Sequence, residues 1–194
     1  MAEERKAAVT LGGNPLTLIG PELKVGQPAP DFTGLDNALQ PVRLGDARGK
    51  VVILASVPSL DTSVCDMETR RFNREASELS GIEVWTVSMD LPFAQKRWCG
   101  TAGVTSVRTL SDFREREFAP AYGVLIKTGL LAGLHARAVF VVGKDGRLKH
   151  VEYVKEMASD PTTLPRWPPP RRPPRGSAVP LNRGRPLSVV PLSV

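Results

Sequence analysis

Two cysteines, Cys65 and Cys99, are the residues of this 194-residue chain best suited to covalent chemistry. They do not form the Cys-x-x-Cys motif of a dithiol of the thioredoxin type. A structural disulfide suits an exported chain, but the charged start at 1–6 with only a short apolar stretch after it predicts no secretion signal. An inert buried thiol is the ordinary alternative for each cysteine. A zinc site that also uses His135 and His150 is disfavoured because the four residues are widely scattered.

The residues around Cys65 favour a reactive thiolate. Cys65 follows an apolar run at 50–57 that Pro58 ends, and the residues at 61–63 are all good helix N-caps. Cys65 is therefore expected in the first turn of a helix. The unpaired backbone N–H groups and the positive end of the helix dipole stabilise an anion there.

The elements that must position the cysteines alternate between strands and helices. The apolar runs at 50–57 and 138–142 are typical of central strands buried on both faces. Further strands are expected at 42–44, 82–88, 107–110 and 148–154, together with a hairpin of 9–11 and 16–19 around Gly12-Gly13-Asn14. Helices are expected from the caps at 61–63 to Leu79, from Pro92 to Cys99, and from Arg114 to Tyr122. The alternation predicts an α/β fold with a mixed central sheet flanked by helices, because the last two strands form a hairpin.

The composition excludes several classes of protein. Apolar residues make up 41% of the chain, and no run reaches the ~18 residues of a membrane span. The net charge of +6 comes from residues 162–194, which hold six arginines and no acidic residue, so that 20 basic and 20 acidic residues remain in 1–161. We therefore expect a cytoplasmic protein whose body binds neither nucleic acid nor membrane.

The segment 162–194 holds nine of the 18 prolines and is expected to be a disordered or polyproline II tail behind a domain at 1–161. Such a tail could also bind a proline-recognising domain or tether the chain to nucleic acid. A third hypothesis is a shifted reading frame. Every Pro codon is CCN, so the frame that begins one base earlier reads NCC, and the segment becomes an Ala-rich helix former. Resequencing the gene tests this hypothesis.

A family resemblance rests on several motifs. The segment from Pro58 to Cys65 matches the peroxiredoxin motif Pro-x-x-x-Thr-x-x-Cys. The segment 90–100 (DLPFAQKRWCG) resembles the second-cysteine segment of thiol peroxidases, the atypical two-cysteine subclass. The segments 12–15, 122–124 and 136–139 also fit this subclass, so the resemblance covers about residues 7–161.

The resemblance implies a thioredoxin-like fold with an N-terminal β-hairpin, and a thiol-dependent peroxidase that needs no cofactor or metal. By position, Cys65 matches the peroxidatic cysteine, which a peroxide oxidises to a sulfenic acid. Cys99 matches the resolving cysteine, which closes an intramolecular disulfide that thioredoxin reduces. Thr62 and Arg137 match the residues that position the thiolate and the peroxide, and Pro58 matches the residue that shields the sulfur. The family also implies a homodimer and a C-terminal helix that the tail here replaces.

Ionisation of the thiol alone does not make a peroxidase. An ordinary thiol with a pKa of ~8.5 is about 3% thiolate at pH 7. Lowering a thiol pKa by about two units gives only about a threefold net gain, because nucleophilicity falls with basicity. Most of the acceleration must come from charge stabilisation on the departing oxygen, which ranks Arg137 above a mere tuner of the thiol. Ser63, Glu68 and Arg114 are candidates for polar support, and His135 is expected to be incidental.

Two other functions stay open at this stage. The same sulfenic acid suits a peroxide sensor or a disulfide donor to client proteins. The basic tail suits a non-enzymatic binding protein. The preferred peroxide and the physiological reductant are not encoded in any recognisable motif.

Overall fold

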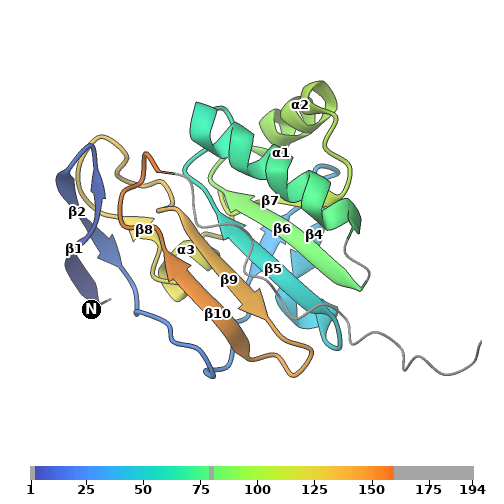
Figure 1. Cartoon of the computed structure of the whole chain (residues 1–194), viewed down its shortest axis with the longest axis horizontal. Helices are drawn as coiled ribbons and strands as arrows, with labels where there is room; N and C mark the ends of the chain where they lie inside the picture. The colour runs from blue at the N-terminus through green and yellow to red at the C-terminus, as the bar shows by residue number, and fades with distance from the viewer. Residues whose placement is uncertain (1–2, 79–80, 160–194) are drawn as a thin grey trace, which may run out of the picture.

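A seven-stranded mixed sheet organises the computed structural model, which describes residues 3–78 and 81–159 (Figure 1). Its strand order is β10-β9-β5-β6-β7-β3-β4. The strands are β3 (Thr33–Leu35), β4 (Pro41–Arg43), β5 (Val51–Ser56), β6 (Ile82–Ser88), β7 (Val107–Ser111), β9 (Ala138–Val142) and β10 (Leu148–Tyr153). The expected tail at 162–194 and the domain boundary at 161 lie outside the described residues.

The two most apolar runs lie at the centre of the sheet, as their composition predicts. β5 and β9 are buried at every position. β5 pairs in parallel with β6 and antiparallel with β9, and β10 forms the predicted hairpin with β9. The antiparallel register places Ser56, the last residue of β5, opposite Ala138, the first residue of β9. Arg137 therefore lies at the edge of the sheet where β5 ends and the loop toward Cys65 begins.

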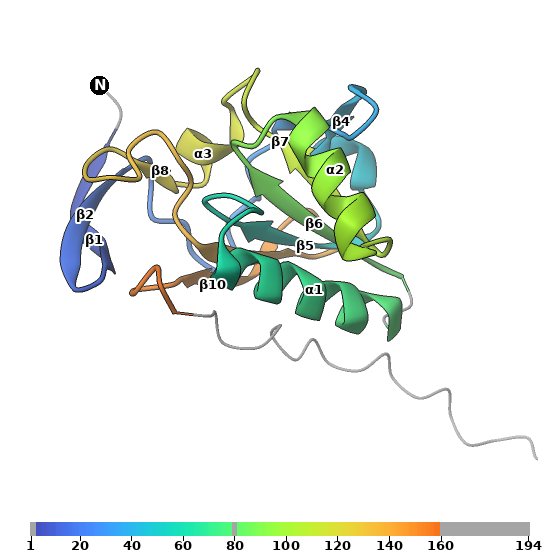
Figure 2. The same cartoon turned by 90° about the horizontal axis from the view of Figure 1, so that it is seen from above.

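Helices α1 (Ser63–Glu78) and α2 (Pro92–Ala102) cover one face of the sheet (Figure 2). Phe72 and Ala76 of α1 and Trp98 of α2 pack against alternate residues of β5 such as Ile53. Val51, Ile53 and Ala55 face these helices, whereas Val52 and Leu54 face a second apolar cluster on the opposite side. The period-two alternation of β5 thus builds two cores from one strand.

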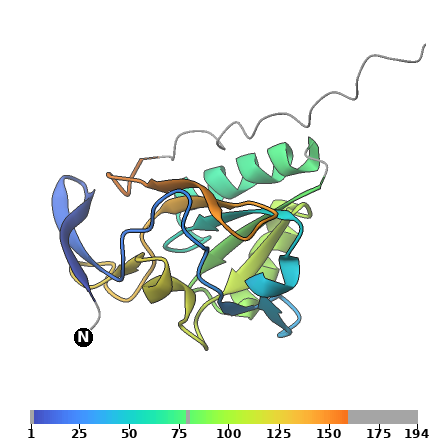
Figure 3. The same cartoon turned by 90° about the horizontal axis from the view of Figure 1, so that it is seen from below.

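The apolar cluster on the opposite side also takes in residues of the short helix α3 (Phe118–Ala121) and of the N-terminal hairpin, which stands at one end of the molecule in Figure 3. The hairpin consists of β1 (Glu4–Leu11) and β2 (Asn14–Ile19), and β8 (Leu125–Ile126) adds a third strand to it. Gly12 and Gly13 form its two-residue turn with φ values of 56° and 79°. Positive φ at both positions is what a type I′ hairpin turn requires, which explains the two consecutive glycines.

The structure differs from the sequence-based expectations at a few boundaries. The helix expected from Arg114 to Tyr122 spans only α3, because both oxygens of the buried Asp112 carboxylate accept hydrogen bonds from the backbone N–H groups of Phe118 and Ala119 and so fix its start there. α2 continues past Cys99 to Ala102. The short strands β3 and β8 carry too few residues for a recognisable period and were not predicted. Leu44 begins a 3-10 helix (Leu44–Ala47) instead of ending a strand.

None of the helices within residues 3–78 and 81–159 has the length and apolar character that crossing a membrane requires.

Candidate active site

The candidate site begins in the loop between β5 and α1. The backbone N–H of Asp66 donates to the carbonyl of Thr62 at 2.9 Å, so α1 starts directly after Thr62 and places Cys65 in its first turn. Asp90 holds the preceding loop, since its carboxylate accepts hydrogen bonds from the Ser59 hydroxyl and the Leu60 N–H, each at 2.8 Å. The position of Cys65 thus follows from the start of a helix after Thr62, where the sequence predicts one, and from one carboxylate of the neighbouring strand end.

Two donors converge on the sulfur of Cys65. The Thr62 hydroxyl lies 2.7 Å from Cys65 Sγ, and Nη2 of Arg137 lies 3.1 Å from it. The thiol itself is 0% exposed, whereas Thr62 is exposed beside it. Hydrogen bonds to an ionised acceptor are the strong ones, so a hydroxyl and a guanidinium directed at one sulfur form a site suited to an anion. This geometry makes Cys65 the candidate reactive cysteine.

A buried carboxylate and a backbone carbonyl orient the guanidinium of Arg137. Nη1 of Arg137 forms an ion pair with Glu68, and Nε donates to the carbonyl of Met157 at 3.3 Å. Arg137 is 2% exposed and Glu68 is 0% exposed. Glu68 lies three residues after Cys65 on α1, so both side chains reach Arg137 from the same helix face. With two of its nitrogens held in this way, Arg137 presents Nη2 to the sulfur.

The backbone around Arg137 is equally constrained. Its carbonyl accepts the N–H of Val154 at 3.0 Å, and the carbonyl of Ala136 accepts the Ser56 hydroxyl at 2.9 Å. The Ser56 hydroxyl thus connects the end of β5 to the segment that carries the arginine. Since β5 also leads into the Cys65 loop, sheet register brings together two residues that are far apart in sequence.

Pro58 is buried in the loop between β5 and α1. This burial agrees with the shielding role that its match to the peroxiredoxin motif implies.

Cys99 lies on α2 and has different partners. Its side chain is half-buried, and its sulfur lies 3.7 Å from Nδ2 of Asn37 and 3.5 Å from the Thr109 hydroxyl. Thr109 also donates to Oδ1 of Asn37 at 3.1 Å, which orients the amide so that its N–H faces the sulfur. The sulfur borders a pocket of about 590 Å³ that Lys96 and Arg108 also line. Both cysteines are free thiols, and they occupy separate helices of the same layer.

Asp66 connects those two helices. Its carboxylate accepts the indole N–H of Trp98 at 3.0 Å and pairs with Arg70, whose Nη1 in turn donates to the carbonyl of Ala102 at 2.9 Å. Trp98 precedes Cys99 in sequence, so this contact fixes α2 next to the first turn of α1.

The remaining candidates have other partners or surroundings. His135 is fully buried and bonds Asp112 at 3.2 Å, where it supports the start of α3. Arg114 pairs with Glu115, and Ser63 is exposed. In the part of the chain that the structure describes, no group of three or more His, Cys, Asp or Glu side chains is arranged to hold a metal ion.

Sequence reasoning gave Glu68 only a supporting place, although its i+3 spacing from Cys65 is a usable signal. It missed Met157 and Asn37. Met157 contributes its backbone carbonyl, which every residue has, so its residue type gives no signal. Asn37 reaches Cys99 from a turn 62 residues earlier in the chain.

Comparison with known proteins shows the family of this chain. The model of the AhpC/TSA family matches residues 25–151. The chain belongs to the AhpC/TSA family. It is 54% identical to a thiol peroxidase of Halalkalibacterium halodurans over 80% of this chain and 92% of the relative, and 50% identical to that of Bacillus subtilis over 80% and 91%.

Solved structures extend the likeness to the fold. A peroxiredoxin-like protein from Aquifex aeolicus superposes with a TM-score of 0.78 and 46% identity, covering 81% of this chain and 92% of that one. Membership of the family and these relatives confirm the thioredoxin-like α/β fold and assign the chain to the peroxiredoxin-type peroxidases.

Proposed function

We propose that the chain is a thiol-dependent peroxidase that reduces hydrogen peroxide and organic hydroperoxides through Cys65, in antioxidant defence. The observation that carries the proposal is the pair of donors at 2.7 Å and 3.1 Å from Cys65 Sγ, one from Thr62 and one from Arg137. These donors are placed to hold a peroxide next to the sulfur as well as to stabilise the thiolate. Pro58 would limit access of water to the same sulfur.

The first step is a displacement at oxygen. The thiolate of Cys65 attacks one peroxide oxygen, the O–O bond breaks, and the sulfur becomes a sulfenic acid. The other oxygen leaves as hydroxide or alkoxide and takes up a proton to give water or an alcohol. Negative charge develops on that leaving oxygen, so a guanidinium already fixed by Glu68 stabilises the transition state without reorganising.

The second step joins the two cysteines. The Cys99 thiol attacks the sulfenic sulfur, and a disulfide forms as water is lost. Because the sulfurs lie on separate helices with separate partners, we expect local unwinding of α1 or α2 before the bond forms. A thioredoxin dithiol then takes the disulfide and is itself oxidised, which restores both thiols. The resemblance also implies a homodimer, which analytical ultracentrifugation tests.

Peroxide consumption coupled to thioredoxin and thioredoxin reductase tests the proposal. The intact chain should turn over, and Cys65→Ser should not. Cys99→Ser should consume one equivalent of peroxide and then stop with thioredoxin as the only reductant. Turnover by Cys65→Ser would refute the assignment of the attacking sulfur. Transfer of the disulfide to client proteins with little thioredoxin turnover would favour a sensor or disulfide donor instead.

A further inference from the structure

One of the contacts that orient Arg137 is made by a backbone carbonyl and not by a side chain. Nε of Arg137 donates to the backbone carbonyl of Met157, which lies beyond β10. Met157 is 3% exposed, and its N–H donates to the carbonyl of Thr10 at 2.8 Å. Thr10 in turn donates its N–H to the carbonyl of Lys155 at 2.6 Å. The carbonyl that orients the arginine is therefore positioned by strand β1 of the N-terminal hairpin.

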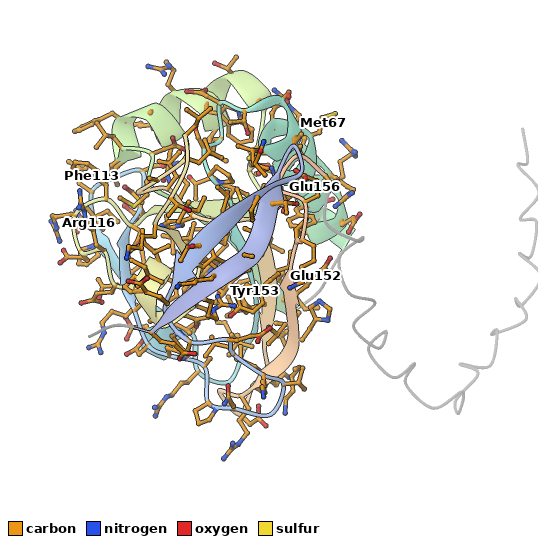
Figure 4. The ribbon with its side chains drawn as sticks, turned by 90° about the vertical axis from the view of Figure 1, so that its left-hand side faces the viewer. Met67, Phe113, Arg116, Glu152, Tyr153 and Glu156 are labelled. Atoms are coloured by element: carbon orange, nitrogen blue, oxygen red, sulfur yellow. The ribbon has the colours of Figure 1, made fainter. Side chains whose placement is uncertain are left out.

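Glu156 fastens this contact between the hairpin and the segment after β10. Its carboxylate accepts hydrogen bonds from the N–H of Gly12 at 2.9 Å, the N–H of Gly13 at 3.0 Å and the Thr10 hydroxyl at 2.9 Å. It also accepts the N–H of Ala158 in its own segment at 3.0 Å. In Figure 4, Glu156 lies beside the end of the hairpin and Tyr153 lies further along it. One carboxylate thus joins the hairpin turn to the segment that carries the Met157 carbonyl.

The carboxylate is charged at neutral pH. The backbone N–H groups of Gly13, Ala158 and Gly12, followed by the Thr10 hydroxyl, lower the pKa of Glu156 to about 2. Hydrogen bonds to a charged acceptor are roughly twice as strong as those between neutral groups. The carboxylate therefore holds its four donors more strongly than the neutral amide of a glutamine would.

We propose that Glu156 is a positioning residue for peroxide reduction, which acts by fixing the Met157 carbonyl and, through it, the guanidinium of Arg137 at the Cys65 sulfur. This inference rests on the proposed function. Glu68 still forms its ion pair with Arg137 when Glu156 is replaced. We therefore expect the guanidinium to be misoriented in the variant and not to leave the site. Even a small displacement of a hydrogen-bond donor lowers a reaction rate strongly. For Glu156→Ala we expect about a tenfold fall in the rate constant for the reaction of Cys65 with hydrogen peroxide.

Two reactions of the same sulfur separate positioning from simple loss of folded protein. Reaction with hydrogen peroxide needs Arg137 at the leaving oxygen, whereas alkylation by iodoacetamide expels iodide and needs no such donor. Both rate constants are measured by stopped flow or quench at one pH in the reduced full-length chain with Cys99→Ser, so that Cys65 is the thiol that reacts. Unfolding would expose Cys65 to iodoacetamide, so circular dichroism first confirms that each variant is folded, and a general structural defect of the folded site then lowers both rates together. A positioning defect lowers the ratio of the peroxide rate to the alkylation rate.

The variants are Glu156→Ala, Glu156→Gln and the matched control Thr128→Ala. Thr128 accepts the N–H of Thr17 at 3.0 Å and so fastens strand β2 of the same hairpin without touching Met157. Glu156→Gln keeps the side-chain shape and one acceptor oxygen, and it serves as the test if the alanine variant does not fold. We expect a tenfold lower ratio for Ala, an intermediate ratio for Gln and an unchanged ratio for Thr128→Ala.

A double-variant cycle with Arg137→Ala completes the test. If Glu156 acts through the arginine, Glu156→Ala has little further effect on the peroxide rate once Arg137 is alanine. An equal fall of both rates, or an undiminished effect without Arg137, overturns the inference. If Arg137→Ala is slow and Glu156→Ala is not, only this inference fails. If Arg137→Ala is as fast as the intact chain, the proposed role of Arg137 fails and this inference fails with it.

Discussion

Replacing Arg137 by alanine should slow the reaction of Cys65 with peroxide by about 10²–10³-fold, the effect of removing one preorganised donor from a developing oxyanion, or roughly 2.7–4 kcal/mol. The structure supports an effect of this size because Nη2 of Arg137 lies 3.1 Å from the sulfur, and both Arg137 and Cys65 are buried. A shift of about two units in a thiol pKa could account for only about threefold in net rate, because nucleophilicity falls with basicity. The two explanations therefore differ by more than an order of magnitude.

The same substitution also removes the partner of a buried carboxylate. Glu68 is 0% exposed and forms an ion pair with Arg137, and breaking a buried pair costs roughly 3–5 kcal/mol. The double variant Arg137→Ala with Glu68→Gln also removes the charge of this carboxylate. It should recover part of the stability of the single variant in urea unfolding while its peroxide reaction stays slow.

The assay follows Cys65 in a Cys99→Ser background, so that one thiol reports. Ultraviolet absorbance of the thiolate gives the ionised fraction at each pH, and stopped flow gives the rate constant with hydrogen peroxide. Rates are then compared at equal thiolate fraction. Equal rates for the intact site and Arg137→Ala under that condition would refute the argument that the guanidinium acts on the leaving oxygen.

Further predictions concern the other residues of the site and the hairpin. Thr62→Val should lower the peroxide rate by about tenfold while Thr62→Ser stays within about threefold, since serine keeps the hydroxyl that lies 2.7 Å from the sulfur; a loss in Thr62→Ser as large as that in Thr62→Val would contradict the assignment of the effect to the hydroxyl alone. In Cys99→Ser treated with peroxide, dimedone labelling should detect a persistent sulfenic acid, and a non-reducing gel or mass measurement should show no intramolecular disulfide. Because the folded-state pKa of Glu156 falls from 4.5 to about 2, its stabilising effect is complete above pH 4.5 and is lost as the pH falls toward 2. Urea unfolding between these pH values should thus depend less on pH in Glu156→Gln, and an unchanged pH dependence would count against the carboxylate.

Much of the fold could be read from the chain because local patterns determine it. The apolar runs that became β5 and β9 cannot be placed anywhere but at the centre of a sheet without exposing them to water. The glycine pair at 12–13 allows a tight hairpin turn, and the cap residues before Cys65 start a helix. The short elements were harder to predict. α3 begins where Asp112 accepts two backbone N–H groups, and this contact depends on the tertiary fold.

For the site, the sequence by itself determined that Cys65 lies in a first helical turn behind a buried strand, because capping and burial are encoded within ten residues. The family resemblance pointed to Arg137, but only the tertiary structure shows how its guanidinium reaches the sulfur. The pairing of Ser56 with Ala138 places Arg137 beside the Cys65 loop, and Glu68 and the Met157 carbonyl aim it. Sheet register and backbone acceptors act between residues that are distant along the chain, so no local pattern of residue types carries them.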